Sequence, residues 1–137
     1  MSKSSHALFC YGTLCIPDIM RAVSGYNRGG HPARLHGYQR VALHGRHYPG
    51  VVPYPDAVTE GVLHQALNGH QLRRIDHYEG NLYLRIRVQV NIALAEQVQT
   101  WTYVLHPRYY HLTKKQPWSL TEFMMHHQAA YQHQHGW

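Results

Sequence analysis

Apolar and polar side chains alternate along two stretches in the second half of the chain. In residues 84–90 (LRIRVQV) every second side chain from Leu84 to Val90 is apolar, and this period of two predicts a strand with one buried face. Residues 97–105 (QVQTWTYVL) alternate in a similar way. Because residues 91–96 separate the two stretches, we expect them to pair as an antiparallel hairpin.

Shorter apolar runs predict three more strands, at residues 7–11, 35–43 and 59–67. Gly12 ends the first of them. Residues 47–55 (HYPGVVPYP) differ, because they carry three prolines and a glycine. Proline has no N–H to donate to a neighbouring strand, so we expect an irregular segment there rather than a central strand.

The clearest helix signal lies at residues 68–78. Asn68 is a suitable N-cap, because its side chain can accept a hydrogen bond from the first turn. Leu72 and Ile75 share one face of the predicted helix. Gly80 follows and ends it.

Two further helical segments lie nearer the ends of the chain. Pro17 is a favourable first residue for a short helix that reaches Val23. Ser119 and Glu122 have the spacing of a capping box, which predicts a helix running to Tyr131. We expect the tail, YQHQHGW, to be frayed.

Taken together, these elements predict an α+β fold. The short strands form a mixed β-sheet that curls toward a barrel, with short helices on its flanks. Because no repeat and no linker divides the sequence, we expect a single domain over residues 1–137, with its core at 7–131 and flexible ends.

The composition is that of a folded protein, since 44% of its 137 residues are hydrophobic. The longest apolar runs span only a few residues, whereas a membrane helix needs about 20. The first residues lack the apolar core of a signal peptide. We therefore expect a cytoplasmic protein without a membrane partner. Cys10 and Cys15 lie five residues apart and do not form a disulfide framework.

The formal net charge is +6 with 14 histidines counted as neutral, which raises the alternative of a protein associated with nucleic acid. That alternative predicts binding that weakens steeply with salt. However, the lysines and arginines are scattered, with no run longer than two. We expect a basic surface and no nucleic-acid partner.

The histidines do not predict a metal site. His126 and His127 are adjacent in sequence, so they point to different faces of a helix. The sequence contains no HExxH motif, and its cysteines and histidines lack zinc-finger spacing. We expect no bound metal.

Three stretches, LFCYGTL (8–14), HYPGVVP (47–53) and EGVLHQALNGHQLRRIDHYEGNLYLRIRVQV (60–90), carry a family resemblance, and VQTWTYVL (98–105) continues it. Read together they resemble the γ-glutamylcyclotransferase-like superfamily, in particular its AIG2-like and YtfP-like branch. The resemblance implies that superfamily's curled sheet, or barrel, with short flanking helices. IDHYEGNLY carries most of its specificity, since YGTL alone is a common tetrapeptide.

The reaction that this resemblance implies cleaves a γ-glutamyl amide. The α-amine of the substrate attacks its own γ-carbonyl, which gives 5-oxoproline and a free amine or amino acid without a cofactor. The enzyme must fold the glutamyl arm into a reactive geometry and remove a proton from the ammonium group. The resemblance points to Glu79 as the general acid/base.

The turn after the first predicted strand provides a second part of the site. A strand that leads into a glycine-containing turn exposes successive N–H groups, which can bind an anion. The resemblance implies that this turn holds the glutamyl end of the substrate. Its residues are Tyr11, Gly12, Thr13 and Leu14.

Tyr83 and Arg85 are further candidates for substrate binding, because the family has Tyr and Arg at these places. Arg85 could bind a substrate carboxylate or could pair with Asp76, and the sequence leaves both open. A second hypothesis of a different class also stays open, in which a protein of the same fold binds a small anionic γ-glutamyl ligand without turnover. Whether Glu79 points into the pocket of the YGTL turn separates the two.

Overall fold

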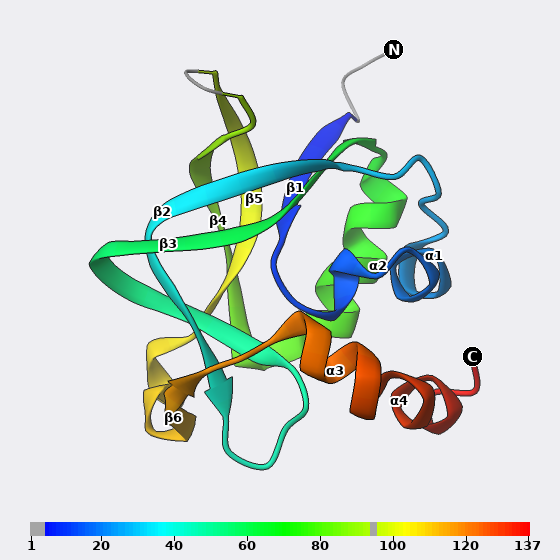
Figure 1. Ribbon diagram of the computed structural model, residues 1–137. Helices are drawn as coiled ribbons and strands as arrows, with labels where there is room; N and C mark the ends of the chain where they lie inside the picture. Colours follow the sequence, from blue (N-terminus) through cyan, green and yellow to red (C-terminus); the bar gives the residue numbers. More distant parts are fainter. Residues whose placement is uncertain (1–4, 94–95) are drawn as a thin grey trace.

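The computed structural model describes residues 5–93 and 96–137 (Figure 1). The strands are β1 (His6–Cys10), β2 (His31–Leu43), β3 (Pro49–Leu67), β4 (Tyr83–Asn91), β5 (Gln97–Leu105) and β6 (Thr113–Pro117). The helices are α1 (Pro17–Ser24), α2 (Gly69–Glu79), α3 (Leu120–His126) and α4 (Gln128–Gln134). Three 3₁₀ segments are η2 (Thr13–Cys15), η3 (Gly80–Leu82) and η4 (Pro107–Leu112). Within these described residues, no helix combines the length and the apolar character that crossing a bilayer requires.

Five of the strands close into a barrel (Figure 1). They follow the order β3-β1-β5-β4-β2, and β2 pairs again with β3. Strands β1 and β5 run parallel, whereas the other neighbouring strands are antiparallel. The short β6 pairs with the end of β2. The predicted curled sheet with flanking helices is therefore confirmed.

The predicted hairpin of β4 and β5 is also confirmed, with Val88 opposite Thr100 in an antiparallel ladder. Part of its turn, residues 94–95, lies outside the described residues. The predicted buried face fails at one end, since Leu84 is 41% exposed. In the described part of the chain, strand β4 pairs with β2 only at Asn91. Its apolar face is therefore most buried near Asn91 and least buried at the opposite end, where Leu84 lies.

The prediction of an irregular segment over residues 47–55 is wrong. Strand β3 begins at Pro49 and continues through the prolines. Its register against β2 shifts between Pro53 and Val58, and Pro55 lies inside this shift. A bulge of this kind interrupts the hydrogen-bond ladder, so the missing proline N–H carries little cost there.

Strand β1 separates two hydrophobic clusters because its side chains alternate. Leu8 and Cys10 belong to the cluster that includes the helices α1, α2, α3 and α4. Phe9, together with Tyr11 just after the strand, belongs to the cluster inside the barrel. One strand thus supports both layers, and the turn that follows it lies where they meet.

The C-terminal region differs from the predicted single helix and frayed tail. Ser119 is the N-cap as expected, and its hydroxyl accepts a hydrogen bond from the Glu122 N–H at 3.1 Å. The helix then breaks at His127, whose φ of −130° is not helical. A second helix, α4, continues to Gln134 and buries Tyr131 to 7% exposure.

Candidate active site

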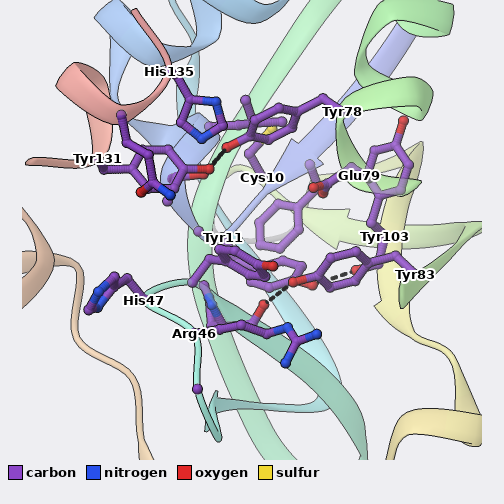
Figure 2. A pocket seen from close by; sticks show the side chains of 18 residues that line it. Cys10, Tyr11, Arg46, His47, Tyr78, Glu79, Tyr83, Tyr103, Tyr131 and His135 are labelled. Atoms are coloured by element: carbon purple, nitrogen blue, oxygen red, sulfur yellow. Dashed lines mark hydrogen bonds between the residues drawn. The ribbon is translucent and has the colours of Figure 1, made fainter. Parts of the chain in front are cut away.

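A pocket of about 380 Å³ lies beside the end of β1 (Figure 2), within the size range of small-molecule sites. It is lined by residues 9–14, by residues 45–49 between β2 and β3, and by the end of α2. Strands β4 and β5 and helix α4 complete the walls. Of the residues predicted for the site, the pocket brings together Tyr11, Gly12, Thr13, Leu14, Glu79 and Tyr83.

Glu79 reaches this pocket because α2 ends there. Asn68 caps the start of α2 as predicted, accepting a hydrogen bond from the Gln71 N–H at 2.7 Å. At the other end Gly80 has a φ of 68°, a left-handed conformation that favours glycine. The chain therefore turns away directly after Glu79.

The Glu79 carboxyl group lies between the rings of Tyr78 and Tyr103 in the pocket (Figure 2). Burial and, to a smaller extent, the charge of Asp76 together raise the pKa of Glu79 from 4.5 to about 8. A carboxyl group with this pKa is mostly protonated at pH 7. It can both accept and donate a proton near neutral pH.

Asp76 is fixed by two neighbours. Arg85 makes a bidentate pair with it, through Nε to Oδ1 at 2.8 Å and Nη2 to Oδ2 at 3.2 Å. The Tyr103 hydroxyl donates to Oδ1 at 2.6 Å. The guanidinium of Arg85 also lies 4.2 Å from the ring centre of Trp101. Arg85 does not line the pocket, so of the two arrangements that the sequence left open the structure contains the ion pair.

The turn at Gly12 forms one wall of the pocket, through residues 11–14. The residues after Gly12 form the 3₁₀ turn η2, in which the Cys15 N–H donates to the Gly12 carbonyl at 3.0 Å. Neither the Thr13 nor the Leu14 N–H donates a hydrogen bond within the described residues. A Cβ at Gly12 would lie 3.0 Å from Pro49 Cδ, so this approach of the turn to β3 favours glycine.

Two tyrosine hydroxyls in the pocket wall hold the backbone around it. Tyr11 donates to the Tyr103 carbonyl at 2.6 Å, and Tyr83 donates to the Pro49 carbonyl at 2.6 Å. Burial raises the pKa of both phenols well above 10, so both stay neutral donors. Tyr11 and Tyr83 therefore fix the pocket wall through their hydroxyls.

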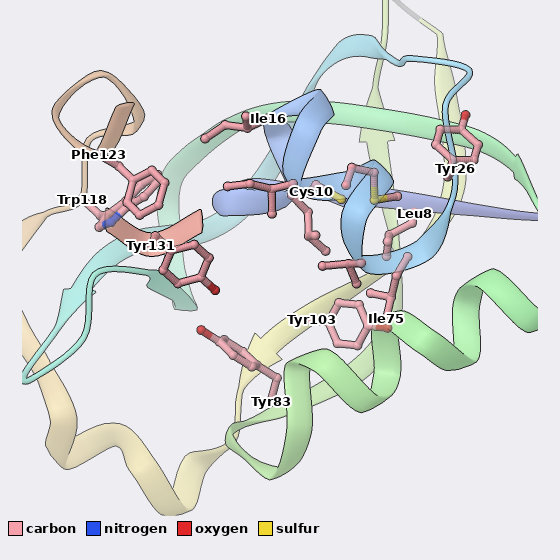
Figure 3. Packing of buried hydrophobic residues seen from close by; sticks show 14 of the residues in the cluster. Leu8, Cys10, Ile16, Tyr26, Ile75, Tyr83, Tyr103, Trp118, Phe123 and Tyr131 are labelled. Atoms are coloured by element: carbon pink, nitrogen blue, oxygen red, sulfur yellow. The ribbon is translucent and has the colours of Figure 1, made fainter. Parts of the chain in front are cut away.

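Two wall residues that the sequence analysis missed are Tyr78 and Tyr131. The Tyr78 hydroxyl hydrogen-bonds to Thr13 Oγ1 at 3.0 Å and also to the Tyr131 hydroxyl. This contact ties α4 to the turn. Tyr131 packs edge-on against Phe123 with ring centres 5.5 Å apart (Figure 3). In the single helix that the sequence predicts, a spacing of eight residues puts these two aromatics in one apolar stripe, and that signal could have identified Tyr131.

The rim of the pocket was also missed. It contains Arg46 and His47 from the turn between β2 and β3, and Gln134 and His135 from the C-terminal region. Figure 2 shows Arg46 and His47 on the side of the pocket opposite His135. No sequence pattern brings residues 46 and 135 together, because only the fold places their segments side by side.

The chain thus combines a closed barrel flanked by helices with a pocket in which the carboxyl group of Glu79 lies beside the turn at Gly12. The family described as "Gamma-glutamyl cyclotransferase, AIG2-like" matches residues 8–122 of the chain. The chain therefore belongs to the AIG2-like γ-glutamyl cyclotransferase family. The resemblance seen in the sequence is thereby confirmed.

Relatives in Arabidopsis thaliana agree with this assignment. Protein AIG2 C is 33% identical over 101 residues, which cover 73% of this chain and 61% of that protein. Protein AIG2 B is 32% identical over 101 residues, which cover 73% of this chain and 60% of that protein. The chain thus spans about six-tenths of the length of these relatives.

Solved structures share the fold. A solution structure of an Arabidopsis thaliana protein has a TM-score of 0.72 at 25% identity, covering 98% of this chain and 91% of that one. A yeast γ-glutamyl cyclotransferase specific to glutathione has a TM-score of 0.63 at 16% identity, covering 83% of this chain and 74% of that one. The second likeness shows the fold alone.

Proposed function

We propose that this protein is a cofactor-independent γ-glutamyl cyclotransferase-type enzyme that converts a γ-glutamyl amide into 5-oxoproline and a free amine or amino acid. The observation that carries the proposal is the position of Glu79. Its carboxyl group lies in the pocket beside the turn at Gly12, with a pKa raised to about 8. Membership of the family supports the same reaction class.

Substrate binding starts at the turn. The N–H groups of Thr13 and Leu14, which donate to no group in the described part of the chain, are suited to hold the glutamyl α-carboxylate, since successive N–H groups form an anion site. The α-ammonium group then lies toward Glu79. An ammonium group within about 4–6 Å favours the ionised carboxylate, so binding of the substrate prepares the base.

The chemical step needs proton transfer and no external reagent. Two protons leave the attacking nitrogen, because an ammonium becomes a lactam N–H. Two protons arrive at the departing nitrogen, because an amide N–H becomes an ammonium. Glu79 takes these two protons from the nucleophile one after the other and passes each to the leaving nitrogen as the C–N bond breaks, which is general acid/base catalysis.

The remaining rate acceleration comes from holding the substrate in a reactive conformation. The attacking nitrogen and the carbonyl carbon belong to one molecule, so the pocket has only to hold the glutamyl arm in its folded form. The neutral phenols of Tyr11 and Tyr83, anchored to backbone carbonyls, make the wall rigid. A rigid wall limits the substrate to few conformations.

The test is release of 5-oxoproline from a panel of γ-glutamyl amino acids and γ-glutamylamines, by wild type and by Glu79→Gln. We expect turnover by the wild type that falls by about a hundredfold or more in the variant. Equal turnover by both proteins contradicts the role of Glu79. If the wild type binds these compounds without releasing 5-oxoproline, the protein is the non-catalytic binder of the alternative hypothesis.

A further inference from the structure

The charges that line the pocket are unevenly placed. Among the lining residues that the structure describes, Glu79 has the one carboxyl group and Arg46 the one guanidinium. Glu79 is half-buried beside the rings of Tyr78 and Tyr103, whereas Arg46 is exposed at the rim (Figure 2). The one cationic side chain that is always charged therefore lies at the rim, apart from the carboxyl group of Glu79.

The rim around Arg46 is held in place from several sides. The Arg46 N–H donates to the Leu43 carbonyl at 3.3 Å, which closes the turn. Trp118 Nε1 donates to the His47 carbonyl at 2.7 Å. The ring of His47 stacks on that of His127, with ring centres 4.3 Å apart and planes 23° apart. These contacts fix the backbone that carries Arg46 against the C-terminal helices.

On the opposite side of the rim, the described lining residues offer polar groups and no side-chain carboxylate. His135 lines the pocket there, and its ring stacks on Trp137 with centres 4.5 Å apart. Gln134 lies beside it. A ligand that leaves the pocket at this rim passes between a guanidinium on one side and an imidazole and an amide on the other.

We propose that Arg46 selects substrates whose leaving group carries a carboxylate, so that the protein acts on γ-glutamyl amino acids or peptides rather than on γ-glutamylamines. This inference rests on the proposed cyclotransferase function. With the glutamyl α-carboxylate at the turn and the γ-amide near Glu79, the leaving group extends toward the rim. There a planar guanidinium is the group best suited to a carboxylate, and it repels the second ammonium of a polyamine.

A pair of substrates tests the effect of the leaving-group carboxylate alone. γ-Glutamylalanine and γ-glutamylethylamide have the same glutamyl arm and the same reacting amide, and they differ by the carboxylate of the leaving group. Release of 5-oxoproline from each is measured for wild type, Arg46→Gln, Arg46→Lys and Arg28→Gln. Arg28 is exposed and does not line the pocket, so its variant is a control with the same loss of charge.

We expect the wild type to prefer γ-glutamylalanine by about tenfold in kcat/KM, the worth of one charge-assisted hydrogen bond at a solvated rim. Arg46→Gln should abolish the preference mainly through KM, because the carboxylate is bound equally before and during the reaction. Arg46→Lys should keep part of it, and Arg28→Gln should keep all of it.

A wild type that uses both compounds equally, or prefers the ethylamide, overturns the inference and leaves the proposed function intact. So does a preference that survives in Arg46→Gln. If the wild type releases no 5-oxoproline from either compound or from the wider panel, the proposed function fails. Titration calorimetry of the same two compounds then decides the role of Arg46, since tighter binding of γ-glutamylalanine that is lost in Arg46→Gln supports it and equal binding refutes it.

Discussion

The unusual protonation of Glu79 has a direct effect on stability, which Glu79→Gln should reveal. In the unfolded chain this carboxyl group ionises above its ordinary pKa of 4.5, whereas in the folded protein it keeps its proton up to about pH 8. Between these two values the folded state binds more protons than the unfolded state. Stability therefore falls as the pH rises through this window.

The size of the effect follows from the two pKa values. Each pH unit inside the window costs at most about 1.4 kcal/mol, so the whole window costs at most about 5 kcal/mol. At pH 8 the folded carboxyl group is about half ionised, so we expect about 4 kcal/mol. Glutamine has no proton to lose, so Glu79→Gln should be the more stable protein at pH 8 by this amount and should lose the advantage near pH 5.

The assay is urea unfolding of both proteins at pH 5, 6, 7 and 8, with the free energy of unfolding from linear extrapolation. Glu60→Gln is the control, because Glu60 is exposed and its variant makes the same chemical change. A difference between wild type and Glu79→Gln that stays constant from pH 5 to 8 would refute the reasoning. It would mean that Glu79 is already ionised in the folded protein at neutral pH.

Two other predictions follow from the same contacts. Asp76→Asn removes the charge that raises the pKa of Glu79, so the rise of kcat/KM with pH, expected through about pH 8, should move to lower pH; an unmoved profile contradicts that coupling. Phe123→Ala empties a site that is 1% exposed and should cost about 3–5 kcal/mol of unfolding free energy, whereas Met124→Ala, at a position 50% exposed, should cost little. Equal losses for Phe123 and Met124 in urea unfolding would show that α3 is not packed as described.

The sequence was informative about local structure wherever one simple rule applies. The alternation at residues 84–90 and 97–105 determined a hairpin, and Asn68 with Gly80 determined both ends of α2. The prolines of residues 47–55 misled the same reasoning, because a register shift in the ladder removes the need for their N–H groups. The sequence also indicated the family and a site around Glu79 and the YGTL turn.

The sequence by itself therefore determined most of the helices and strands, and the groups of site residues that lie close together in one short motif. Only the tertiary structure decided which distant segments meet. Closing the barrel brought the turn at Gly12 to the end of α2, and the break at His127 let α4 place Tyr131 against Tyr78. It also set Arg46 opposite His135 at the rim. Such contacts depend on how the elements pack against one another. The sequence pattern of each element reflects its own helix or strand and does not show which distant element it will contact.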